Sequence, residues 1–387
     1  MTAYVWQNDN WPTFRFDAEK LLIPLGRCRR VQGELQHLMR TLDDRYVVET
    51  EALLLESEAL RTSEIEGVQL NPQSVRSSVA RKLGLEDAGL RQPDRYTEGL
   101  IEVLMDATQN HQQTLTPERL FGWHAALFPT GYSGMSRIAV GCYRSDESGG
   151  MQVVSGRPGK QVVHYEAPPA ERLVREVDIF LHWFNTTGTA CRNKCKAGGE
   201  TGGMDGILRA GMAHFHFVTL HPFDDGNGRL ARVITDMAMA QDEGTARRDY
   251  SISATIAAAR KAYYAVLEQA QKGNGDITEW LIWFVQALEQ AMRSSMEAIA
   301  LTLRKTEFWK RTARTPLNER QRKVLNRLLD AGPEGFEGGL TNKKYVSMTK
   351  AAPATATRDL ADLVAKGVLR PVAGGRSTRY EVDMWVI

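Results

Sequence analysis

Residues 221–232 read His221-Pro-Phe-Asp-Asp-Gly-Asn-Gly-Arg-Leu-Ala-Arg232, and this stretch decides how the chain folds and what it binds. Its Gly-Asn-Gly run can turn successive backbone N–H groups toward one point and leads into a helix, an arrangement that binds anions. Arg229 and Arg232 share one face of that helix and can reach further phosphate oxygens. Asp225 is an oxygen ligand of the kind that Mg²⁺ takes beside a polyphosphate. His221 can accept a proton near neutral pH.

These features together predict a nucleotide cradle with a proton acceptor beside it. The plainer alternative is a turn made by Gly-Asn-Gly, with His221 packed as a core imidazole. A base, a carboxylate, a glycine turn and two arginines fall within twelve residues, and this density favours the nucleotide site.

The stretch resembles the motif of the Fic family, His-Pro-Phe-x-Asp-Gly-Asn-Gly-Arg-x-x-Arg, at every defined position. Fic proteins are mostly adenylyltransferases, which move AMP from ATP onto hydroxyl groups of target proteins. The resemblance implies His221 as the catalytic base, Asp225 as the Mg²⁺ ligand and Phe223 as a buried anchor. The positions that it implies for ATP binding are Glu66, Gly226, Asn227, Gly228, Arg229, Leu230, Ala231, Arg232, Tyr264 and Gln271.

Residues 62–67, Thr-Ser-Glu-Ile-Glu-Gly, resemble the inhibitory pattern of the same family, Ser/Thr-x-x-x-Glu-Gly, in a place ahead of the core. The resemblance implies that Thr62, Glu66 and Gly67 end an inhibitory helix over about 49–67 and that Glu66 pairs with Arg232. The plainer alternative is a solvated glutamate before a helix-ending glycine.

A hairpin is predicted between Tyr143 and Pro169, where two short β-prone runs surround a Gly/Pro turn. Residues 141–144 and the second run resemble the family's flap, which binds the target backbone as an added strand. The flap positions implied for target binding are Val162, Val163, His164 and Tyr165.

A long polar loop is expected over Thr186–Gly206, because glycines and polar residues replace the helical period there. Cys191 and Cys195 in this loop suggest zinc only if histidines from elsewhere complete the ligand set. His214 lies on an apolar helical stripe and is expected to pack in the core.

Composition is that of an ordinary globular protein, with 42% apolar and 25% charged residues and a net charge of +2. No run reaches the ~18 apolar residues of a membrane-spanning helix, and the N-terminus lacks the apolar core of a secretory signal. Four cysteines are too few for a disulfide framework in a chain of this size. We therefore expect a cytoplasmic protein with reduced thiols and no membrane partner.

The predicted fold is mainly α, a Fic-type helical core with a β-hairpin flap, plus a C-terminal winged-helix domain. We expect an N-terminal helical extension over 1–110, the core over 111–310 and a winged helix-turn-helix domain over 315–387. From Arg314 to Ile387 the chain has 13 basic and 8 acidic residues, an excess that the rest of the chain does not share.

The C-terminal segment reads as three helices followed by a hairpin wing, and it resembles the winged-helix modules of DNA-binding proteins. The residues expected near the start of the recognition helix are Thr355, Thr357 and Arg358, and those in the wing are Arg376 and Arg379. The alternative is a module for protein contact or dimerisation, since an excess of five charges is modest for a DNA reader.

We expect an enzyme that transfers AMP from Mg·ATP to a Tyr, Thr or Ser hydroxyl of a target protein and that Glu66 keeps quiescent. The expected partners are ATP, the target protein, DNA or a protein at the winged helix, and a second copy in a homodimer. Two alternatives stay open. One is a DNA-binding regulator whose Fic core only senses nucleotide, and the other is a Fic enzyme that transfers a different phosphate-containing group or removes AMP.

Overall fold

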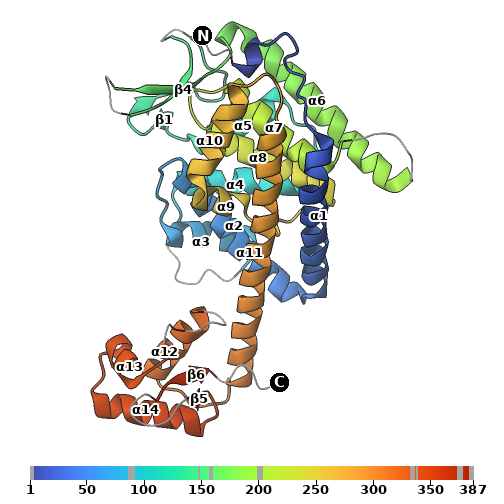
Figure 1. Cartoon of the computed structure of the whole chain (residues 1–387). Coiled ribbons are helices and arrows are strands. Elements are labelled where there is room, and N and C mark those ends of the chain that lie inside the picture. Colours follow the sequence, from blue (N-terminus) through green and yellow to red (C-terminus); the bar gives the residue numbers. More distant parts are fainter. Residues whose placement is uncertain are drawn as a thin grey trace. The chain divides into compact units, whose positions relative to one another are not determined.

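The computed structural model describes residues 4–85, 92–146, 149–156, 160–197, 204–331, 336, 339–372 and 378–382. These residues are mainly helical, which confirms the predicted fold class, and their strands form short antiparallel pairs (Figure 1). The chain divides into two compact units, residues 1–295 and 296–387. No helix of the described residues is long and apolar enough to cross a membrane.

The helices of the first unit are η1 (Val5–Gln7), α1 (Ala18–Thr41), α2 (Asp44–Ile65), α3 (Pro72–Lys82), α4 (Arg95–Gln109), α5 (Pro117–Leu127), α6 (Ala170–Ala197), α7 (Gly206–Leu220), α8 (Asn227–Glu243), α9 (Ile252–Ala258) and α10 (Arg260–Gln271). Its strands are β1 (Tyr132–Ser133), β2 (Ser136–Arg137), β3 (Gln152–Ser155) and β4 (Val162–Glu166). Helix α11 (Thr278–Arg311) continues into the second unit, which holds α12 (Glu319–Asp330), α13 (Asn342–Thr349), α14 (Pro353–Ala365), β5 (Leu369–Pro371) and β6 (Tyr380–Val382).

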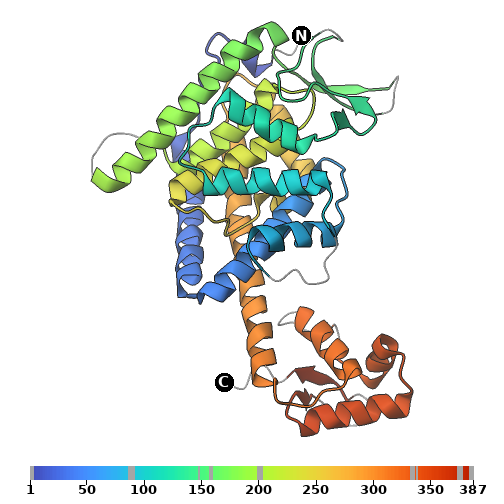
Figure 2. The same cartoon turned by 180° about the vertical axis from the view of Figure 1, so that it is seen from behind.

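Helices α7 and α8 lie in the middle of the first unit in both views (Figure 1, Figure 2). Every residue of α7 is buried, Arg209, His214 and His216 included, so the helix is enclosed on all sides rather than on one face. His214 is fully buried in α7, with Nδ1 2.9 Å from Thr235 Oγ1 and Nε2 2.9 Å from the Tyr263 hydroxyl, as predicted for a packed core histidine. This rigid pair carries the loop of residues 221–226 between its two helices.

The N-terminal segment is fixed to the first unit at three points. The indole of Trp6 donates to the Glu166 carbonyl (2.8 Å), and that of Trp11 donates to the Glu176 carboxylate (2.7 Å). Arg15 pairs with the backbone of residues 275–277, its N–H donating to the Gly275 carbonyl (2.8 Å). The segment therefore packs against the flap, α6 and the start of α11.

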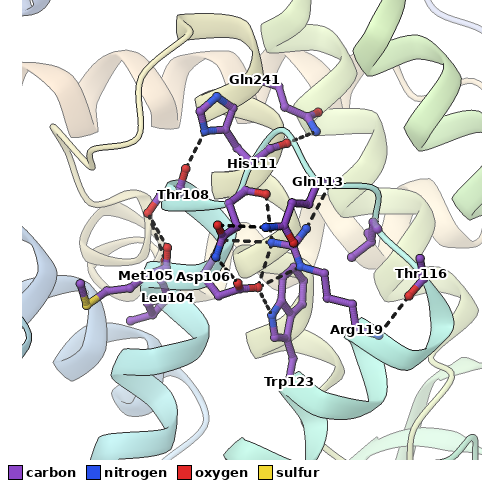
Figure 3. A network of polar contacts seen from close by, with 12 residues as sticks. Leu104, Met105, Asp106, Thr108, His111, Gln113, Thr116, Arg119, Trp123 and Gln241 are labelled. Carbon is purple, nitrogen blue, oxygen red and sulfur yellow. Dashed lines mark hydrogen bonds and ion pairs between the residues drawn. The ribbon is translucent and has the colours of Figure 1, made fainter.

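A polar network joins α4 and α5 and ties them to α8 (Figure 3). Asp106 accepts from Arg119 Nε (2.9 Å) and from Trp123 Nε1 (2.7 Å), so one carboxylate fixes two residues of α5. Gln241 of α8 donates to the His111 carbonyl (2.7 Å). These bonds order the connection between α4 and α5, whose backbone carbonyls would otherwise lack partners.

The second unit has its own core. Phe308 of α11 packs there with Leu325, Tyr345, Leu360 and other apolar residues. Its contribution explains why this unit begins inside α11, upstream of the residue-315 boundary expected from composition. β5 pairs with β6, and Leu340 adds a bridge to Tyr380. The helices lie where predicted, while Arg376 falls outside the described residues and the winged-helix assignment stays a prediction.

The prediction of a long polar loop over residues 186–206 is wrong for residues 186–197, because α6 continues to Ala197. The hydroxyls of Thr186 and Thr187 donate to the carbonyls of His182 and Trp183, both at 2.7 Å, so these residues bond within the helix rather than ending it. Residues 198–203 and the side chains of Cys191 and Cys195 lie outside the described residues.

Helix α2 also begins earlier than the residue-49 start implied for the inhibitory helix, at Asp44. Val47 is β-branched and only 8% exposed, and its burial outweighs its weak helix preference. The end of the helix is as expected, with Gly67 in the left-handed region at φ 78°.

Two glycines on the facing helices α4 and α5 should respond oppositely to alanine. A Cβ on Gly99 would fall on the Ala126 carbonyl oxygen, whereas one on Gly122 meets nothing within 4 Å. We expect Gly99→Ala to lower the free energy of unfolding by about 1–3 kcal/mol through overpacking. Gly122→Ala should raise it by roughly 0.5–1 kcal/mol through helix propensity. Urea unfolding followed by circular dichroism measures both, and equal shifts in the two variants would contradict this packing.

Candidate active site

The loop that begins at His221 is held in a strained conformation. His221 ends α7 in the left-handed region at φ 49°, which a residue with a side chain adopts at a cost. Arg144, only 4% exposed, donates from Nε to the His221 carbonyl (2.8 Å), and its backbone N–H donates to the Pro222 carbonyl (3.0 Å). Arg144 therefore holds the His221 backbone in place.

The imidazole of His221 presents a free nitrogen to the site. Its Nδ1 lies 3.1 Å from the Val218 carbonyl, which can only accept, so Nδ1 carries the hydrogen and Nε2 keeps its lone pair. Burial lowers the pKa of His221 below its ordinary value of 6.5. The neutral form, which can accept a proton at Nε2, is therefore dominant at neutral pH.

Phe223 and Asn227 close the loop. Phe223 is fully buried, as the motif implies, and stacks on His124 with ring centroids 4.2 Å apart. The Asn227 side chain accepts from Phe223 N–H (3.0 Å) and donates to the Phe223 carbonyl (2.8 Å). Asn227 therefore offers a phosphate only its backbone, because its side-chain amide is bound within the loop.

Helix α8 presents an uncapped N-terminus at the end of this loop. Gly226 is its N-cap, at φ 84° and without a side-chain hydrogen bond to the first turn. A Cβ on Gly228 would meet Glu66 Oε1 at 2.5 Å, so glycine lets a carboxylate approach this turn closely. The first turn of α8 is thus positioned to hold an anion, and Glu66 lies against it.

Glu66, Thr62 and Arg232 meet beside that turn. Arg232 is 1% exposed, and its Nη2 donates to Glu66 Oε1 (2.7 Å) and to the Thr62 carbonyl (3.2 Å). Its Nε donates to Thr62 Oγ1 (2.8 Å). The structure therefore brings together the residues that the resemblance paired across 166 positions of sequence.

Arg229 and Asp225 lie on the other side of the loop. Arg229 is 3% exposed, donates to the Tyr96 hydroxyl (2.7 Å) and lies over the Phe128 ring. Its Nε has no hydrogen-bond partner among the described residues. Asp225 accepts from Gly226 N–H (2.5 Å) and from the Ser133 hydroxyl. Leu230 and Ala231 are fully buried, so only their backbone can face a ligand.

Tyr264 and Gln271, two of the positions implied for ATP binding, both lie on α10. Tyr264 is 38% exposed, and burial together with the Glu66 carboxylate raises the pKa of its hydroxyl. Gln271 is 4% exposed, and its amide donates to Thr219 Oγ1 (3.3 Å), two residues before His221. These two residues border the site from different turns of one helix.

The predicted flap is the hairpin of β3 and β4, with a register shift between Val153 and Val154. Val162 and Val163 are exposed, as target binding requires. Tyr165 is 1% exposed and donates to the Thr219 carbonyl (2.7 Å), so its side chain anchors the flap. His164 Nδ1 lies 2.8 Å from Glu268 on α10, which fixes the other end of the strand.

The sequence profile of the Fic/DOC family matches residues 114–239, which include α5 to α8 and the loop of His221. Residues 114–239 form a Fic/DOC family domain. A second profile, described only as a domain of unknown function (DUF4172), matches residues 4–85. The segment that supplies Glu66 thus precedes the Fic domain in a separately defined region.

Two curated relatives align with part of the chain. Protein adenylyltransferase fic-1 of Caenorhabditis briggsae is 38% identical over 104 residues, and the same protein of Caenorhabditis elegans is 37% identical over 104 residues. Each alignment covers 27% of this chain and 17% of the relative. The chain therefore spans about a sixth of the length of the curated relatives that it matches.

Two solved structures share the fold. A Fic family protein from Desulfovibrio desulfuricans superposes with a TM-score of 0.51 at 15% identity, covering 96% of this chain and 98% of that chain. A Fic domain containing signaling protein from Bacteroides thetaiotaomicron gives 0.50 at 14% identity, covering 71% of this chain and 97% of that chain. At such identities the likeness shows the fold alone.

The Fic domain contains supporting residues to which sequence reasoning gave no such role. His124 contacts the Asp225 carbonyl through Nε2 (3.1 Å) and accepts from Gly141 N–H at Nδ1 (3.2 Å). The sequence predicts Arg144 only as part of the flap, and it predicts no role for Ser133. All three act through tertiary contacts, and their spacing in the sequence carries no pattern that identifies them.

Proposed function

We propose that the chain is a protein adenylyltransferase that moves AMP from ATP to a Ser, Thr or Tyr hydroxyl of a target protein. The observation that carries this proposal is the buried Arg232 guanidinium, which holds a carboxylate against the N-terminus of α8. A guanidinium and a helix N-terminus that converge on one point bind phosphate by the same contacts. The curated relatives, named protein adenylyltransferases, support the choice of nucleotide and reaction.

The proposed reaction uses His221 as the base. Nε2 takes the proton of the target hydroxyl while the hydroxyl oxygen forms a bond to the α-phosphorus of ATP. The bond between that phosphorus and the oxygen bridging to the β-phosphate breaks, and pyrophosphate leaves. The backbone N–H groups of the first turn of α8, with Arg229 and Arg232, stabilise the negative charge on the phosphates.

The residues of the loop fit Mg²⁺. Among the described residues no three His, Cys, Asp or Glu side chains cluster as a self-sufficient metal site. Mg²⁺ beside a polyphosphate needs only one or two carboxylates, because phosphates and waters supply its other ligands. The Asp225 side chain is 37% exposed and would hold the ion, which when bound neutralises charge on the phosphates. The Ser133 hydroxyl and Gly226 N–H orient its carboxylate.

Glu66 blocks this site in the present arrangement. Its carboxylate uses the Arg232 donor that an outer phosphate of ATP needs, and it adds negative charge where that phosphate would lie. We therefore propose that the enzyme is autoinhibited until Glu66 leaves Arg232. Removal of AMP from a target by the same site remains an alternative reaction of the same residues.

Replacing Glu66 should activate the enzyme. We expect Glu66→Gly to raise the transfer of labelled AMP, onto target or onto the protein itself, by at least ~10-fold, which corresponds to ~1.4 kcal/mol. The matched control is Glu64→Gly, at an exposed glutamate two residues earlier whose ion-pair partner is Arg61. The control should transfer at the wild-type rate, and equal rates for Glu66→Gly and wild type would rule out autoinhibition.

The pH dependence of the activated enzyme should report His221. Because burial lowers its pKa, the neutral base persists below pH 6.5, and transfer by Glu66→Gly should fall only as the pH drops through a value beneath 6.5. His221→Ala in that background should abolish transfer while ATP affinity, measured by calorimetry, stays within about threefold. If transfer already falls while the pH is lowered toward 6.5 from above, His221 does not have this role. Loss of ATP binding in His221→Ala would also contradict it.

A second function is favoured by the charge of the C-terminal unit, which we propose binds DNA. Lys343 on α13, Lys350 at the C-cap of that helix and Arg358 on α14 are exposed. The two acidic residues of these helices are occupied, since Asp359 accepts from Arg320 and Asp362 pairs with Lys366. These three exposed cations are the groups of this region that could contact phosphates.

A mobility-shift assay with the full chain and duplex DNA tests this function. We expect a retarded band at low salt, weakened with rising salt, and at least about fivefold lower affinity for Arg358→Ala. Arg327→Ala, at an exposed arginine on α12, serves as the control and should change affinity less. No retarded band at low salt would exclude DNA and leave a protein partner for this unit.

A further inference from the structure

A row of polar side chains runs along α2 and extends beyond the inhibitory pattern. Glu58, Thr62 and Glu66 are spaced four residues apart and therefore share one face of the helix. Thr62 and Glu66 contact Arg232, as described above. Glu58 lies two turns before Glu66, is fully buried and makes its contacts elsewhere.

The Glu58 carboxylate is bound by the N-terminus of α9. It accepts from the Ser251 hydroxyl (2.7 Å), from the Ser253 hydroxyl and from Ser253 N–H (3.3 Å). Ser251 is the N-cap of α9, so the carboxylate meets the positive end of that helix. A buried carboxylate with these donors is satisfied in one position only, because a shift of α2 would leave it without partners.

The same carboxylate is linked to α8. Arg248 Nη1 lies 3.7 Å from Glu58, and Arg248 Nη2 lies 2.5 Å from Asp236. Arg248 and Asp236 are both buried, and Asp236 follows Arg232 by four residues on α8. Helix α2 is thus joined to α8 at two levels, by Glu66 and Thr62 on Arg232 and by Glu58 through Arg248 on Asp236.

We propose that Glu58 is a positioning residue that fixes the register of α2 on α8 and α9, so that Glu66 meets Arg232. This inference rests on the proposed function of Glu66 and names the contact that maintains the inhibited state. Glu58 does not touch the nucleotide site, and it acts on transfer through the position of Glu66. A partner that pulled α2 from Ser251, Ser253 and Arg248 would activate the enzyme without contacting the nucleotide.

Glu58→Gln tests the inference, because it removes the charge while keeping the side-chain volume. We expect transfer and ATP affinity to rise by roughly 3- to 30-fold over wild type, with Glu66 still present. Amide hydrogens of residues 60–66 should exchange faster, because that end of α2 opens more often. In the Glu66→Gly background, Glu58→Gln should raise neither transfer nor ATP affinity further, because the glutamate that Glu58 positions is gone.

Two variants control this experiment. Glu56→Gln changes a half-buried glutamate of the same helix, whose pKa is raised by burial and lowered by the charge of Arg76. This variant should match wild type in transfer, ATP affinity and hydrogen exchange. Ser253→Ala removes one donor to Glu58 from the side of α9 and should raise transfer in the same direction by a smaller factor. If Glu58→Gln fails to fold, Ser253→Ala tests the inference in its place.

The outcomes separate this inference from the proposed function. Suppose first that Glu66→Gly activates the enzyme, so that autoinhibition stands. The positioning role is then overturned if Glu58→Gln and Ser253→Ala leave transfer and ATP affinity unchanged. It is also overturned if they lower transfer equally in the wild-type and Glu66→Gly backgrounds. If Glu66→Gly does not activate, autoinhibition fails, and hydrogen exchange decides the remaining claim. Faster exchange of residues 60–66 in Glu58→Gln then supports the register contact, and unchanged exchange overturns it.

Discussion

The buried guanidinium of Arg232 is the constraint on which the rest of the site depends. A charge that is 1% exposed must have an anionic partner, since removing one member of a buried pair costs about 3–5 kcal/mol. Glu66 is that partner here, at 2.7 Å. The phosphates of a nucleotide could replace it, because they offer the same charge and acceptor geometry. Under the proposed function, inhibition and catalysis would be two ways of satisfying one buried cation.

Under the proposed function, the fold brings both anions to the same place. Helix α8 begins at Asn227, after its N-cap Gly226, and the absence of a side chain at Gly228 lets the Glu66 carboxylate reach the first turn, where a phosphate would bind. Helix α2 ends at Ile65 and Glu66 is its C-cap, because Gly67 adopts a left-handed conformation, which leaves the glutamate at the helix terminus. The fully buried α7 and the bond from Arg144 Nε hold the His221 backbone beside this turn.

The groups that the sequence predicts for the site lie within one loop, so their roles could be predicted from local spacing. His221, Asp225 and the glycine turn could be assigned roles from residues 221–232 alone, whereas the Glu66–Arg232 contact was reached only through a family resemblance. The contacts of the Asn227 side chain could not be predicted, since its amide bonds to Phe223 within the loop, but the backbone role predicted for Asn227 is unaffected. The extension of α6 was missed because Thr186 and Thr187 resemble a helix end, yet their hydroxyls bond back to the helix. Arg144 and His124 depend on tertiary contacts that no periodicity reveals.

Calorimetric titration of wild type and Glu66→Gly with ATP and with AMP tests the central claim most directly, because it measures competition for Arg232 without any transfer step. If Glu66 takes the place of an outer phosphate, its removal should strengthen ATP binding by about tenfold or more while AMP binding, which lacks that phosphate, stays unchanged. An equal change for both nucleotides, or no change for either, would contradict the account.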